Sequence, residues 1–194
     1  MSARDDILAR VRRNQPPASA MPAVPVFPPP PGSLIERFKV ALQRMGGKVA
    51  EPAPGASLPE FVRALFPSGA IFASATPEIR GDRDLGAVRK PGELADVDVG
   101  VVRGVFGVAE TGSVWLTCNE FHVDSLGFLA QHLVVLLDRA RIVATMHDAY
   151  RERTQFDVRY GVFMTGPSAT ADIEGVLIHG AQGVRSLTVV PAPR

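Results

Sequence analysis

The feature that most constrains the fold of this chain is the run His132–Leu137 (HLVVLL), which is apolar almost throughout. A strand with one exposed face alternates polar and apolar residues, so a continuous apolar run is typical of a central strand covered on both faces. Further strand-like runs lie at Val97–Val102, Val114–Thr117, Tyr160–Thr165 and Leu187–Val190. Helical patterns separate several of these runs. The sequence therefore predicts an α/β fold in which helices flank a layered, mostly parallel sheet.

The expected helices are marked by capping residues and by apolar spacing. Ser33-Leu34-Ile35-Glu36 and Ser57-Leu58-Pro59-Glu60 both match the capping-box pattern, in which the serine and the glutamate satisfy free amides of the first turn. A third amphipathic helix is predicted from Ile142 to Tyr150, and a short helix is predicted over residues 170–178.

The 194-residue chain suits one domain with an N-terminal appendage. Residues 1–32 are expected to form a short helix and then a proline-rich arm, which can be neither helix nor central strand. The folded domain is predicted to span residues 33–194. The arm either docks on this domain or on a neighbouring subunit, which would allow self-association, or serves as a linker.

Composition argues against several classes of function. The formal net charge is +1 and no basic block is interleaved with aromatic residues, so nucleic-acid binding is not expected. Cys118 is the only cysteine, which excludes a disulfide within the chain and an iron–sulfur cluster ligated by its cysteines. The four histidines lack metal-ligand spacing, so no metal site is predicted. No bound cofactor is predicted in this chain either. No run approaches the roughly 20 apolar residues of a membrane helix, and we expect a cytoplasmic protein.

The stretch Glu110-Thr111-Gly112-Ser113 places a carboxylate, a hydroxyl and a glycine at the junction of two strand-like runs. Ligand chemistry in α/β proteins is common at such junctions. Glu110 is the candidate catalytic residue, as a general base, a carboxylate nucleophile or a hydrogen-bond anchor. The alternative is that Glu110 only satisfies backbone amides beside a tight glycine turn. Thr111 and Gly112 are candidate ligand-binding residues.

A second polar group follows the strand-like run Tyr160–Thr165. Ser168 and Thr170 precede the predicted helix that carries Asp172 and Glu174. A helix N-terminus attracts anions, so all four are candidate ligand-binding residues. The alternative is that the hydroxyls cap the helix while the carboxylates complement its dipole.

A histidine stands at the end of this second group. His179 precedes a glycine-rich turn and is the best functional candidate among the histidines. Because parallel strands deliver their following loops to one edge of a sheet, we expect both polar groups to meet at the carboxyl edge and to form one pocket.

Four segments resemble one known family. They are Gly107–Val114 (GVAETGSV), His132–Leu137 with the following Arg141–Val143, Ser168–Glu174 (SATADIE) and Gly180–Arg185 (GAQGVR). In this order they resemble the lactate-utilisation protein C (LutC/YkgG-type) family, with its LUD domain. The resemblance implies a NagB/RpiA/CoA-transferase-like fold and a part in the oxidation of L-lactate to pyruvate. It also implies iron–sulfur partner proteins, which would carry the clusters, and it assigns no catalytic residue.

The chain departs from this family at two places. The family usually reads Gly-x-His-Gly-Pro in the last turn, where this chain has Gln182 and Val184. An imidazole at that turn is therefore absent. The arginine that the family usually carries between the ETG strand and the next strand has no clear match near Asp124-Ser125.

Three functional hypotheses follow. The first is a component or accessory factor of lactate oxidation. The second is a stand-alone enzyme acting on a sugar phosphate or an acyl-CoA, with Glu110 as the attacking carboxylate. The third is a non-catalytic assembly module that grips a neighbouring subunit with its arm. The sequence leaves open whether the chain is an enzyme.

Overall fold

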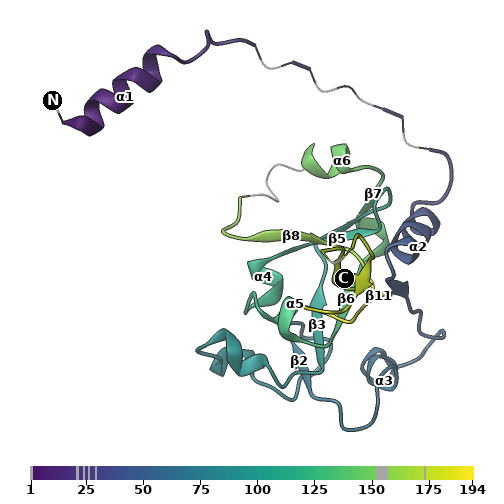
Figure 1. The fold of residues 1–194 in the computed structure, drawn as a ribbon. Coiled ribbons are helices and arrows are strands. Elements are labelled where there is room, and N and C mark those ends of the chain that lie inside the picture. Colours follow the sequence, from purple (N-terminus) through teal and green to yellow (C-terminus); the bar gives the residue numbers. More distant parts are fainter. Residues whose placement is uncertain are drawn as a thin grey trace.

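A computed structural model describes residues 2–20, 22–23, 25, 27–28, 30–151, 157–172 and 174–194. Its central feature is a five-stranded sheet in which every pairing is parallel (Figure 1). The strand order is β1 (Lys48–Val49), β11 (Ser186–Pro191), β6 (His132–Leu137), β3 (Val99–Arg103) and β2 (Phe72–Ser74). The predicted α/β fold with a mostly parallel sheet is confirmed, and the apolar run forms the middle strand.

The two faces of this sheet explain why β6 is apolar throughout. Leu133, Val135 and Leu137 belong to one core cluster. Val134 and Leu136, which point to the opposite face, belong to a second cluster. All five side chains are almost fully buried.

Helices cover both faces of the sheet. Helix α2 (Leu34–Arg44) contributes Phe38 and Leu42 to the first core cluster. Helix α3 (Leu58–Ala64) contributes Val62 to the second cluster. The shorter helical elements are α4 (Cys118–Phe121), α5 (Leu126–Leu129), η1 (Leu85–Ala87), η2 (Pro91–Leu94) and η3 (Arg139–Arg141). Ser33 and Ser57 occupy the predicted N-cap positions, but neither side chain makes a capping hydrogen bond.

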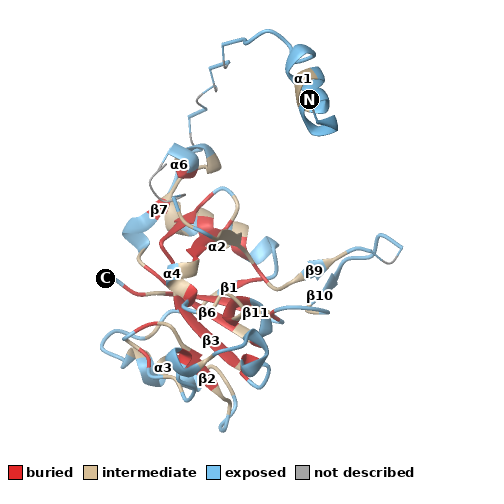
Figure 2. Ribbon diagram, turned by 90° about the vertical axis from the view of Figure 1, so that its left-hand side faces the viewer, coloured by how far each residue is buried: buried red, intermediate tan, exposed pale blue. Residues whose placement is uncertain are grey.

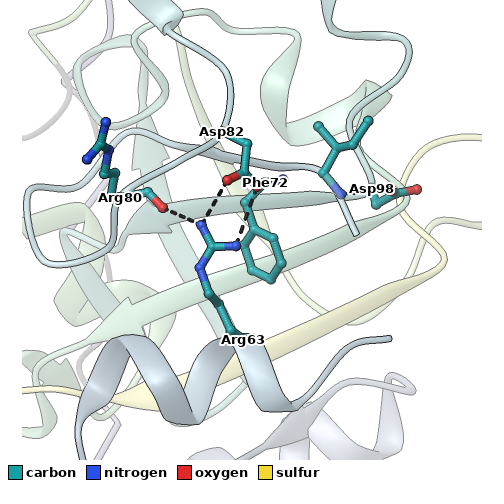
Figure 3. A network of polar contacts seen from close by, with 6 residues as sticks. Arg63, Phe72, Arg80, Asp82 and Asp98 are labelled. Carbon is teal, nitrogen blue, oxygen red and sulfur yellow. Dashed lines mark hydrogen bonds and ion pairs between the residues drawn. The ribbon is translucent and has the colours of Figure 1, made fainter. Parts of the chain in front are cut away.

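An arginine on α3 fastens this helix to the edge of the sheet (Figure 3). The Nη2 atom of Arg63 donates to the carbonyl oxygen of Arg80 at 2.8 Å and to Asp82 Oδ1 at 3.1 Å. The guanidinium also lies 4.6 Å from the ring centroid of Phe72. Asp82 accepts the amide of Phe72, and this bond, followed by the contact with Arg63, lowers the pKa of the Asp82 carboxyl. These contacts hold α3 against β2.

A second, four-stranded sheet lies beside the first and was not predicted. Its order is β7 (Ile142–Val143), β4 (Phe106–Val108), β5 (Ser113–Thr117) and β8 (Gly161–Met164). Strand β5 is antiparallel to both β4 and β8, whereas β4 and β7 are parallel. The helix predicted from Ile142 is wrong at its start, because residues 142–143 pair with β4 and the helix α6 spans only Met146–Arg151.

The segment after β8 forms a projecting hairpin in place of the predicted helix. Strands β9 (Ala169–Thr170) and β10 (Ile178–His179) pair antiparallel, so the helix over residues 170–178 is wrong. Glu174 and Gly175 have φ values of 55° and 71°, which form a turn and would end a helix. Figure 2 shows this hairpin, Ala169–His179, extending from the body with mostly exposed residues.

The N-terminal region extends away from the domain (Figure 1). Helix α1 (Ala3–Arg13) is capped by Ser2 and Asp5 and has no buried residue. The arm reaches the domain at its far end, where Pro30 accepts a hydrogen bond from Arg37 at 3.1 Å and the Phe27 ring lies 6.1 Å from that of His147. Among the described helices, none is long and apolar enough to cross a membrane.

Candidate functional site

The Glu110-Thr111-Gly112-Ser113 stretch forms the loop between β4 and β5, and its glycine packs against α2. Gly112 has a φ of 66°, which favours glycine. A Cβ atom at this position would lie 2.7 Å from the carbonyl carbon of Ala41 and would collide with the backbone of Leu42. A glycine is therefore required for the loop to approach the helix this closely.

A second glycine loop, after β8, packs against the same helix end. Gly166 has a φ of 64°, and a Cβ atom there would collide with the carbonyl group of Met45. The hydroxyl of Thr165 lies 3.5 Å from the carbonyl oxygen of Thr111, to which it donates. We call the two loops, Thr111–Ser113 and Thr165–Pro167, the clamp, because both hold the C-terminal end of α2.

The clamp places the two polar groups at one edge, but of a different sheet from the one expected. Strands β4 and β8 are both antiparallel to β5, so they run in the same direction and their following loops emerge together. This edge belongs to the four-stranded sheet. The expectation that the groups meet at the carboxyl edge of the main parallel sheet is wrong, because neither preceding strand belongs to that sheet.

Glu110 is exposed, and one of its oxygens is engaged. Its Oε2 atom accepts the backbone amide of Met146 at 2.8 Å, at the start of α6. The hydroxyl of Thr111 bonds to that of Ser113 at 2.5 Å. Within the described residues, the other oxygen of Glu110 accepts no hydrogen bond. Glu110 thus satisfies a backbone amide, as one interpretation of the sequence suggested, and keeps one free acceptor.

A cavity of about 480 Å³, which we call the arm cavity, lies beside Glu110. Its walls are the end of the arm at Pro30 and Gly32, one face of α2, and the loop carrying Glu110. Arg37 and Arg44 both line it from α2. Arg37 is held by Pro30, whereas Arg44 makes no ion pair or hydrogen bond with the part of the chain that the structure describes.

Ser168 lines a different cavity, of about 510 Å³, which we call the hairpin cavity. It is lined by Val162–Ser168 of β8 and the clamp, by Phe128 and by Gln182–Val184. The backbone of Ser168 donates to Val184 at 2.9 Å and accepts from Gly180 at 2.6 Å. Gln182 and Val184, where the resemblance led us to expect histidine and proline, line this cavity.

The remaining candidates lie on the hairpin, outside the lining of both cavities. Thr170 accepts the amide of Asp172 at 3.4 Å. Asp172, Glu174 and His179 are exposed. Because the described residues of this segment form no helix, they offer no helix dipole to attract an anion. A Cβ atom on Gly46 would lie 3.9 Å from the His179 ring, so the imidazole sits beside the end of α2.

Arg37 and Arg44 are the residues that sequence reasoning missed. They lie seven positions apart on α2, so they share one helix face, but nothing in the sequence indicates that the arm and Glu110 close a cavity over that face. Among the described residues, no group of three or more His, Cys, Asp or Glu is placed to hold a metal ion.

Comparison with known proteins identifies the family. Residues 87–190, more than half of the chain, match the LUD domain. The chain belongs to the LUD domain family. The match includes Glu110, both clamp loops and the hairpin, whereas the arm and α2 precede it.

One sequence relative and one solved structure are similar to the chain. The chain is 27% identical over 123 residues to lactate utilization protein C of Shouchella clausii (strain KSM-K16), covering 61% of this chain and 53% of the relative. The chain thus spans about half the length of that protein. The crystal structure of a DUF162 family protein from Deinococcus radiodurans has a TM-score of 0.60 and 14% identity, covering 81% of this chain and 95% of the other. It shares the fold.

Proposed function

We propose that this protein is a component or accessory factor of L-lactate oxidation to pyruvate. The observation that carries the proposal is the LUD domain match over residues 87–190, together with the relative named lactate utilization protein C. We further propose iron–sulfur proteins as partners. Cys118 is the only cysteine, so cysteines of another chain would have to supply the ligands for any cluster.

Within this function we propose Glu110 as an anchor for a ligand. One of its oxygens is committed to the amide of Met146, which fixes the carboxylate, and the other is free to accept a proton donor of a ligand. Ser168 is proposed as a polar contact in the hairpin cavity, whose other lining residues are largely apolar.

The test is growth on L-lactate. Deleting the gene in its host should abolish growth on L-lactate and leave growth on pyruvate unchanged, because the block lies before pyruvate. Expression of the full-length chain should restore growth, and Glu110→Gln should restore it poorly. Glu60→Gln makes the same change at an exposed position on α3 and should restore growth fully. Normal growth of the deletion strain on L-lactate would contradict the proposal.

The partners are tested separately. Affinity purification of the tagged full-length chain from lactate-grown cells should recover proteins that contain iron and acid-labile sulfide. Recovery of the chain alone, under conditions in which the partner proteins are present in the lysate, would remove the iron–sulfur partners from the proposal.

A second candidate function, assembly, is favoured by α1. This helix has no buried residue, and Ile7 and Val11 are 62% and 53% exposed. An isolated helix of this length is marginal in water, so its apolar stripe is better explained by a partner surface. Removing residues 1–32 should leave the domain folded and reduce self-association or recovery of partners. Unchanged sedimentation and unchanged recovery would show that the arm is only a linker.

A further inference from the structure

A third cavity, of about 270 Å³, has a lining with an excess of positive charge. We call it the turn cavity, and its walls are Val88–Pro91, His122–Ser125 and, just before β8, Arg159. The cations of this lining are Arg89, Lys90 and Arg159, whereas Asp124 is its only carboxylate. With His122 neutral, three cations and one carboxylate leave an excess of two positive charges.

Hydrogen bonds hold the three walls of the turn cavity against one another. The Ser125 hydroxyl donates to the carbonyl oxygen of Pro91 at 3.4 Å, and Arg159 Nη2 donates to Asp124 Oδ2 at 3.5 Å. The first contact brings the segment of Lys90 against the segment of Asp124, and the second adds Arg159. A sphere of the cavity's volume is only about 8 Å across, so groups that line it are within reach of one small ligand.

The cations of the turn cavity are incompletely compensated. Arg159 is 81% exposed, and a contact of 3.5 Å at such an exposed position stabilises little. Arg89 Nη1 donates to the carbonyl oxygen of Gly86 at 2.8 Å, and its guanidinium contacts no carboxylate in the part of the chain that the structure describes. The Lys90 ammonium makes no hydrogen bond or ion pair with the described residues. These charges therefore remain available to a ligand.

The wall at His122 is formed by a strained turn. His122 has a φ of 57° and a ψ of −45°, and the amide of Val123 donates to the carbonyl oxygen of Phe121 at 2.6 Å. This is a γ-turn with positive φ, which is rare and strained in proteins. Phe121 and Leu126, on either side of the turn, are both fully buried, so the core holds the turn in place. The turn thus presents His122 and the residues after it as a preformed wall.

The charge and the size of the turn cavity select the kind of anion that fits. A phosphate dianion would neutralise an excess of two positive charges, whereas a monocarboxylate would leave one uncompensated. Guanidinium groups bind phosphate through paired hydrogen bonds, and lysine binds it as a point charge. Glu93 lies outside the lining and accepts the backbone amide of Arg89 at 3.0 Å. The volume is below the roughly 300–1,000 Å³ of sites that enclose a drug-sized ligand, so it suits a phosphate group with few further atoms.

From these features we infer that the turn cavity binds a phosphate group, either of inorganic phosphate or of a small phosphate monoester. Lys90 and Arg159 contact the phosphate oxygens from two walls, and Arg89 adds positive charge. The inference goes beyond the proposed function and does not rest on it, because the turn cavity shares no lining residue with the arm cavity or the hairpin cavity. Its whole lining lies within the LUD domain match.

The ligand class is tested by calorimetric titration of the full-length protein with sodium phosphate, methyl phosphate and acetate. The titrations are run at equal ionic strength and about pH 8, where both phosphates are dianions. The phosphates should give saturable binding, and acetate should bind about tenfold more weakly because it carries half the charge. Tighter binding of methyl phosphate would assign the cavity to a monoester, and tighter binding of phosphate would assign it to the free ion. Absence of saturable binding by both phosphates, or equally tight binding of acetate, would overturn the inference.

Variants locate the binding at the turn cavity. Lys90→Gln and Arg159→Gln should each weaken phosphate binding by about fivefold, because each removes an exposed cation that contacts the anion. Arg80→Gln makes the same charge change as Arg159→Gln at an exposed residue outside the lining, and should leave binding unchanged. Circular dichroism establishes that each variant is folded. Undiminished binding by both Lys90→Gln and Arg159→Gln, or an equal loss in Arg80→Gln, would refute the site.

Discussion

The clamp and the hairpin both lie within the LUD domain match, yet they occupy opposite physical environments. The clamp packs so tightly on α2 that Gly112 and Gly166 cannot carry a side chain without displacing backbone. The hairpin leaves Val176 and Leu177 61% and 58% exposed. Packing therefore accounts for the glycines of the clamp, whereas it does not account for the apolar residues of the hairpin.

The two regions illustrate two roles of a sequence motif, packing within the domain and contact with another molecule. The clamp is a scaffold that fixes where Glu110 and Ser168 stand, each at the wall of its own cavity. The hairpin contributes little to the core, so its composition is better explained by contacts outside the chain. Matched substitutions in the clamp region and in the hairpin test this interpretation.

The largest effect is expected at the centre of the clamped helix. Leu42 is fully buried, and Leu42→Ala should lower the free energy of unfolding by about 2–5 kcal/mol through lost burial and a residual cavity. Urea unfolding of the variant and the parent protein measures this cost. A loss below about 1 kcal/mol would show that the end of α2 is loosely held, contrary to the close packing of the clamp.

The next effect is expected at the glycines. Gly112→Ala should cost about 3 kcal/mol, the sum of overpacking against α2 and a left-handed backbone conformation. Gly175 in the hairpin is the matched control, because its φ of 71° is similar and a Cβ atom there would have no described atom within 4 Å beyond its chain neighbours. Gly175→Ala should cost only about 1 kcal/mol. Equal losses in urea unfolding would mean that backbone strain alone, without the contact to α2, explains the clamp.

The main sheet could be predicted from the sequence because its evidence lies within single short segments of the chain. The apolar run of β6 reports burial on both faces. The second sheet escaped prediction because β4 and β7 are only three and two residues long, and because β7 and β8 pair with strands that are remote in the chain. Strands of this length are too short to show an alternation of polar and apolar residues.

The hairpin was misread for a different reason. Thr170-Ala171-Asp172 matches the start of a helix, with a hydroxyl at the cap and an acid in the first turn. The turn at Glu174 and Gly175 decides the outcome, because both residues adopt positive φ. The arm cavity was out of reach for sequence analysis, since it depends on the loop at Glu110 lying beside α2, which is remote from it in the chain.

Acidification should affect the start of β6 and β11 in the main sheet more than the clamp. His132 starts β6 and bonds through Nδ1 to the hydroxyl of Ser186 at 2.8 Å. Burial lowers the pKa of His132, as do the nearby cations Arg185 and Lys48, while Asp98 opposes them. Because the folded pKa lies below the unfolded one, the stability from neutral His132 is present above the unfolded pKa and is lost as the pH falls below it.

Hydrogen exchange tests this pH dependence. Between about pH 7.5 and about pH 5.5, protection of residues near Ser186 should fall more than protection of Thr111–Ser113. His132→Gln, which cannot titrate, should remove the difference. A parallel fall in both regions, or a fall that persists in His132→Gln, would show that another group governs the response.

The smallest effect is expected at the hairpin tip. Leu177→Ala makes the same chemical change as Leu42→Ala, but Leu177 is 58% exposed, so little buried area is lost. The free energy of unfolding should change by less than about 0.5 kcal/mol. A cost above about 1.5 kcal/mol would show that the hairpin packs on the domain in solution, and the contrast with the clamp would then disappear. Reduced recovery of partner proteins by Leu177→Ala at unchanged stability would instead assign the exposed apolar side chains to an interface, because only a contact outside the chain would then depend on them.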